Sequence, residues 1–131
     1  VRATLAALLA RITAGADADR LLDHYTAEHV RSRAGVLGGQ LVQTRRMRGL
    51  SADTRVAARE HLLYRLDRDG EKVRLSVNGT TLELPGKAEA ALRDALTRGE
   101  FVVRDLGGGL DEAGRVVLVR RLVREGCLQV L

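Results

Sequence analysis

Leucines recur at helical spacing near the start of the chain. Leu5, Leu8, Leu9 and Ile12 follow the i, i+3, i+4, i+7 pattern. This spacing places them along one face of a helix over about residues 2–13. A helix this short is marginal in water unless its apolar face packs against something, so we expect this stripe to have a partner.

Two further helical segments are predicted downstream, over about residues 18–31 and 34–47. Asp17 has the side chain and the position of an N-cap for the first of them. Residues 1–50 are therefore predicted to form a helical segment that pairs with a second copy of the chain or packs on another domain. The predicted interface residues are Leu5, Leu8, Leu9, Ile12, Leu21, Leu22, Leu37 and Leu41.

The hydrophobic period changes from helical to alternating after residue 60. Val73, Leu75 and Val77 alternate with polar residues, which is typical of a half-buried strand. Asn78-Gly79 follows directly and is a strong hairpin signal. We predict a three-stranded antiparallel meander over about 61–84, preceded by a connector over about 50–60.

Helical periodicity returns in the C-terminal part, over about 87–98 and 111–125, with Asp111 as the N-cap of the second helix. Shorter elements are expected at 101–103 (extended), 104–106 (a helical turn) and 127–131 (a strand). This is the order of a winged helix, except that the hairpins precede the helices. The predicted class is α+β, with a helical segment over 1–50 and a winged-helix-like domain over 51–131.

The charge distribution bears on nucleic-acid binding. The net charge is +5, and its excess lies in residues 1–60, where ten arginines accompany six acidic residues. Arg120, Arg121 and Arg124 lie opposite the apolar arc of the helix over 111–125, where a winged helix contacts phosphates or bases. No Asn, Gln, Ser or Lys accompanies them, and the surrounding residues are nearly neutral. A solvated basic face is therefore the preferred interpretation, and nucleic-acid binding the alternative.

The densest basic cluster is Arg45-Arg46-Met47-Arg48. It offers a contact for RNA or for an acidic protein. Arginines near the end of a helix also complement the helix dipole and its free carbonyls, and this structural role is the preferred interpretation.

Candidate catalytic chemistry is sparse. Cys127 lies in an apolar run and is predicted to be a buried small side chain. A single cysteine forms no disulfide within the chain, which fits a reducing cytoplasm. His24 and His29 diverge by about 140° on a helix and share no metal ion. No catalytic, cofactor-binding or metal site is predicted, and neither a membrane span nor a signal peptide is recognised.

Several stretches resemble one known family. They are Phe101–Leu106, Leu110–Gly126, Arg31–Leu41 and the run from His61 to Pro85. They are similar to the C-terminal region of bacterial JmjC-type cupin oxygenases, which include enzymes that hydroxylate ribosomal proteins. The resemblance implies a dimerising helical region and an accessory winged helix. It also implies a parent enzyme that uses Fe(II) and 2-oxoglutarate in a cupin barrel. No residue of this chain matches the family's His-x-Asp…His iron triad, so no catalytic residue is carried over.

The sequence therefore predicts a non-catalytic dimerisation or accessory module of such a protein or peptide hydroxylase. The expected partners are a second copy, the cupin catalytic domain, or both, in the cytoplasm, with no membrane contact. The alternative is a winged-helix nucleic-acid-binding protein that uses Arg120, Arg121 and Arg124.

Overall fold

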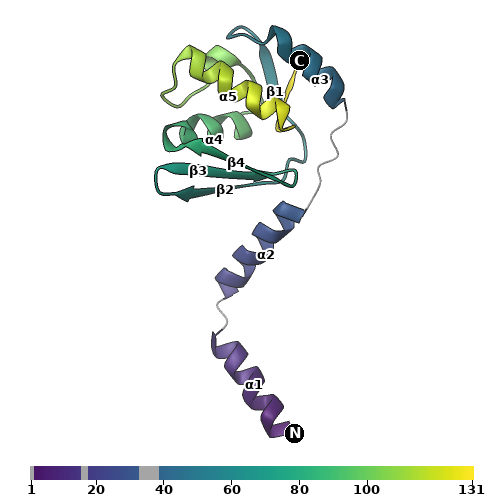
Figure 1. The fold of residues 1–131 in the computed structure, drawn as a ribbon, viewed down its shortest axis with the longest axis vertical. Helices are drawn as coiled ribbons and strands as arrows, with labels where there is room; N and C mark the ends of the chain where they lie inside the picture. The colour runs from purple at the N-terminus through teal and green to yellow at the C-terminus, as the bar shows by residue number, and fades with distance from the viewer. Residues whose placement is uncertain (1, 16–17, 33–38) are drawn as a thin grey trace.

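The computed structural model describes residues 2–15, 18–32 and 39–131. Of the two N-terminal helices, α1 (Arg2–Gly15) extends away from the folded C-terminal unit, whereas α2 (Ala18–Ser32) contacts it (Figure 1). Both helices were predicted. Asp17, the expected N-cap, lies outside the described residues, as does Leu37 of the third predicted helix.

The predicted meander is confirmed. Its strands are β2 (Tyr64–Asp69), β3 (Lys72–Val77) and β4 (Thr80–Pro85), paired antiparallel in the order β2-β3-β4. Asn78 and Gly79 have φ values of 50° and 79°, the left-handed conformation that a tight two-residue hairpin turn requires. Val73, Leu75 and Val77 of the central strand are all buried, as their alternation indicates.

A second sheet has the order β5-β1-β6 and corrects one prediction. Its strands are β1 (Arg55–Ala58), β5 (Glu100–Val102) and β6 (Leu128–Val130). The central strand β1 lies inside the segment that we interpreted as a connector. Val56 pairs with Phe101 on one side and with Val130 on the other, so partners distant in the sequence stabilise a four-residue strand with little alternation of its own.

The C-terminal helices agree with the predicted ranges. They are α4 (Glu89–Thr97), preceded by the 3₁₀ turn η2 (Gly86–Ala88), and α5 (Glu112–Arg124), preceded by the 3₁₀ turn η3 (Val103–Asp105). The carboxylate of Asp111 accepts a hydrogen bond from the Gly114 N–H at 2.8 Å, which confirms Asp111 as the N-cap of α5. The α+β class is confirmed.

One apolar core joins the two sheets to α4 and α5. It runs from Met47 to Val130 and includes the inward faces of both helices. The loop before α5 passes very close to α4, because a Cβ atom on Gly108 would lie 2.3 Å from the Ala91 backbone nitrogen. Gly108 also has a φ of +91°, so glycine is required there for both reasons.

Helix α3 (Gln40–Arg46), with the following 3₁₀ turn η1 (Met47–Gly49), docks onto this unit through two glutamines. Gln40 Nε2 donates to the last carbonyls of α5, on Val123 and Arg124, at 3.0 and 2.9 Å. The side chain of Gln43 pairs with both backbone groups of Val130, accepting from its N–H at 2.7 Å and donating to its carbonyl at 3.4 Å. Gln43 thus covers the free edge of β6.

Helix α2 lies against the meander with one face. Val30 is only 2% exposed. Arg65 on β2 donates to the Asp23 carbonyl at 2.8 Å and pairs with the carboxylates of Asp23 and Asp67. The hydrogen bond that Arg65 donates to the Asp67 carboxylate is the main cause that raises the pKa of Arg65 above its ordinary value. These contacts hold α2 in place and leave its other face uncovered.

Candidate functional site

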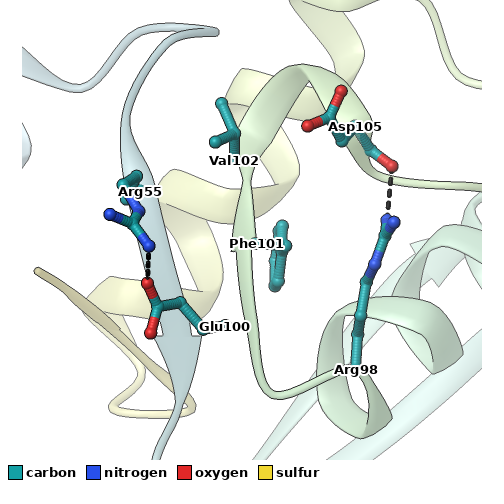
Figure 2. Close-up of a pocket in the computed structure, with 6 residues that line it drawn as sticks. All are labelled: Arg55, Arg98, Glu100, Phe101, Val102 and Asp105. Atoms are coloured by element: carbon teal, nitrogen blue, oxygen red, sulfur yellow. Dashed lines mark hydrogen bonds and ion pairs between the residues drawn. The ribbon is translucent and has the colours of Figure 1, made fainter.

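The depression beside β5 is lined mainly by charged side chains that bond to neighbouring residues (Figure 2). It has a volume of about 370 Å³ and is lined by Arg55, Arg98, Glu100, Phe101, Val102 and Asp105. Figure 2 shows Arg55 paired with Glu100, while Arg98 donates to the Asp105 carbonyl on the other side of the strand. Phe101 points away from the Arg55–Glu100 pair and is nearly buried. The Arg55–Glu100 pair links β1 to β5, and the hydrogen bond from Arg98 links the end of α4 to the 3₁₀ turn that follows β5.

The residues that most often perform catalysis are dispersed. Among the described residues, no group of three or more His, Cys, Asp or Glu side chains is placed to hold a metal ion. His29 stacks on the ring of Tyr25, with ring centroids 5.9 Å apart. Cys127 is buried, as predicted, and its burial, together with the nearby charge of Glu125, raises the pKa of the thiol to about 12.

The predicted interface leucines are the main exposed apolar residues of the N-terminal helices. Leu5, Leu8 and Leu9 on α1 are 50–57% exposed. Leu21 and Leu22 on α2 are exposed to a similar degree, and Tyr25 accompanies them. We call this set the apolar arm; its residues are Leu5, Leu8, Leu9, Leu21, Leu22 and Tyr25. Of the other predicted interface residues, Leu41 is exposed on α3, and the side chain of Ile12 and all of Leu37 lie outside the described part.

The arginines of the alternative prediction are also exposed. Arg120, Arg121 and Arg124 project from α5 and, with Val117 and Glu125, line a groove of about 290 Å³. A second groove, of about 450 Å³, shares Arg120 and Arg124 and is also lined by Thr44, Met47 and Arg48 of α3 and η1.

The two basic clusters identified in the sequence therefore share one surface. Within the first cluster the roles divide: Met47 is buried, and Arg46 donates to the Val130 carbonyl at 2.9 Å. Met47 and Arg48 both line the groove with Arg120 and Arg124, and Arg48 brings a third arginine to it. Sequence reasoning treated the clusters separately, because no local signal shows that η1 and α5 are neighbours.

Comparison with known proteins adds no further assignment. No protein-family model matches the chain, and no curated protein matches it. None of the described helices is both long and apolar enough to cross a membrane.

Proposed function

We propose that this chain is a non-catalytic association module in which the apolar arm pairs with the arm of a second copy. The exposure of Leu5, Leu8 and Leu9 on a helix that extends away from the folded unit carries the proposal (Figure 1). Burying a leucine side chain fully contributes about 1.5–3 kcal/mol, so a stripe of half-exposed leucines favours association strongly. The folded unit has its own core and does not cover this stripe.

A second copy suits the arm because its two helices differ in charge. Helix α1 carries Arg2 and Arg11 and no acidic residue. Helix α2 carries three acidic residues, Asp19, Asp23 and Glu28, and two arginines, Arg20 and Arg31, so its net charge is −1 against +2 for α1. Pairing α1 of one copy with α2 of the other brings the arginines near the acidic residues and buries both sets of leucines, whereas pairing α1 with α1 brings like charges together.

The resemblance to JmjC-type cupin oxygenases supports the proposal that this module belongs to a larger enzyme. In that family the corresponding helical region dimerises the enzyme and the winged helix is accessory. We therefore propose the winged-helix-like domain as the accessory part of a cytoplasmic protein or peptide hydroxylase. Fe(II) and 2-oxoglutarate would belong to the cupin domain of that parent. The described residues do not fit an iron site, so no step of the reaction is assigned to them.

The test is the oligomeric state in sedimentation velocity over a range of concentrations. The wild-type chain should be dimeric at high micromolar concentration, and the double variant Leu5→Glu/Leu8→Glu should be monomeric. Val117→Glu is the control, because it places one such negative charge on an exposed apolar residue of α5, outside the arm. It should remain dimeric. A wild-type chain that is monomeric at high micromolar concentration would refute the arm pairing.

A further inference from the structure

The arginines of the folded unit differ in their pairing, and some outside the groups below, Arg45, Arg46 and Arg115, also form no ion pair with a carboxylate of the described residues. On the meander, α4 and the β5–β1–β6 sheet, arginines pair with carboxylates. Arg68 and Arg93 both pair with Glu89, and Arg74 pairs with Glu83. By contrast, no ion pair joins Arg48, Arg120, Arg121 or Arg124 to a carboxylate of the described residues. We call these four arginines the basic face.

Helix electrostatics explain only part of this face. Arg121 and Arg124 lie in the last turn of α5, where basic residues complement the helix dipole. The final carbonyls of α5 are already satisfied by Gln40, at 3.0 and 2.9 Å. Arg48 belongs to η1, and the tertiary fold brings it to the same groove. A single role at a helix end therefore does not account for the face.

Two grooves adjoin the basic face. Arg120 and Arg124 border both grooves and lie one helical turn apart, about 6 Å along the α5 axis. Arg120 reaches the Leu50 carbonyl only at 3.5 Å, so its guanidinium keeps donors for a ligand. A guanidinium matches a phosphate with two parallel hydrogen bonds.

We propose that the basic face binds the phosphate backbone of a duplex nucleic acid. An exposed helix face can enter the groove of a duplex, where its arginines reach the phosphates. The three aromatic residues, Tyr25, Tyr64 and Phe101, lie outside both grooves, so the face has no platform for stacking single-stranded bases. No Asn or Gln lines the grooves, which favours binding that is independent of base sequence.

This surface is separate from the apolar arm, so the proposal stands whether or not the chain dimerises. The experiment is fluorescence anisotropy of the full chain with a short DNA duplex and an RNA duplex of the same sequence, titrated at several salt concentrations. The wild type should bind at least one duplex with steep salt dependence, and which of the two it prefers identifies the source of the phosphates. The variant Arg120→Gln/Arg124→Gln should weaken binding about tenfold or more and reduce the logarithmic salt slope by about 2.

Matched controls separate the face from net charge and from folding. Arg55→Gln/Arg93→Gln removes the same charge from ion-paired positions elsewhere and should bind within about twofold of the wild type. Arg120→Lys/Arg124→Lys keeps the charge and should retain most of the affinity. Far-UV circular dichroism establishes that every variant is folded. Three results would overturn the proposal: no binding at low salt, equal losses in both glutamine variants, or displacement of the duplex by polyglutamate at an equal charge concentration.

Discussion

Replacing Gln43 by alanine should weaken the attachment of α3 to the edge of the β5–β1–β6 sheet. Gln43 is 8% exposed, and its side chain forms hydrogen bonds with both backbone groups of Val130, which is 7% exposed. The Val130 carbonyl keeps a second donor, Arg46, at 2.9 Å. The Val130 N–H has no other acceptor among the described residues and becomes a buried unpaired donor.

The expected loss of stability follows from this difference between the two backbone groups of Val130. A buried donor left unpaired costs about 1–3 kcal/mol, and the longer bond to the carbonyl adds little because Arg46 replaces it. We therefore expect Gln43→Ala to lower the free energy of unfolding by about 2 kcal/mol. For a folded unit of this size, that corresponds to a decrease in Tm of roughly 8–16 °C.

Urea unfolding followed by far-UV circular dichroism is the suitable assay, because the chain has no tryptophan and only three other aromatic residues. The midpoint should fall while the m-value stays constant, since the same surface is exposed on unfolding. Thr44→Ala is the control: Thr44 is exposed on the same helix, and its hydroxyl bonds only to the Gln40 carbonyl, at 3.0 Å. It should change stability by less than about 0.5 kcal/mol. A Gln43→Ala variant as stable as the control would show that the edge of β6 needs no side-chain cap.

Gly108 and Cys127 give two further predictions. Gly108→Ala should destabilise the fold by about 3 kcal/mol or more, because a left-handed φ and a 2.3 Å approach to the Ala91 backbone exclude a Cβ atom. A Cβ atom added at Gly49 meets no atom within 4 Å, so Gly49→Ala should leave Tm nearly unchanged in a thermal melt. Equal Tm values for Gly108→Ala and Gly49→Ala would contradict the close approach. The thiol of Cys127, with a pKa raised to about 12 by burial, should not react with a disulfide reagent at pH 8 until urea unfolds the chain. Rapid labelling of the native protein would show that the thiol is accessible.

Local signals were sufficient for most of the elements. The alternation of Val73, Leu75 and Val77 and the Asn78-Gly79 turn predicted the meander, because period and turn chemistry depend on adjacent residues only. Asp111 predicted the start of α5 for the same reason. The apolar stripe of α1 could be predicted from the spacing of its residues alone, and its leucines are exposed in the structure.

Long-range contacts decided the rest. Strand β1 has a weak pattern of its own and exists because Phe101 and Val130 pair with it from either side. The role of Gln43 depends on the edge of β6, which forms only when the C-terminus of the chain returns to the sheet. The basic face depends in the same way on η1 lying beside α5. Apart from β1, the sequence by itself determined which segments are helical or extended, because that choice is made mostly within a few residues. The tertiary structure decided which distant side chains share a surface, because hydrogen bonds and packing between segments far apart in the chain have no signature in local spacing.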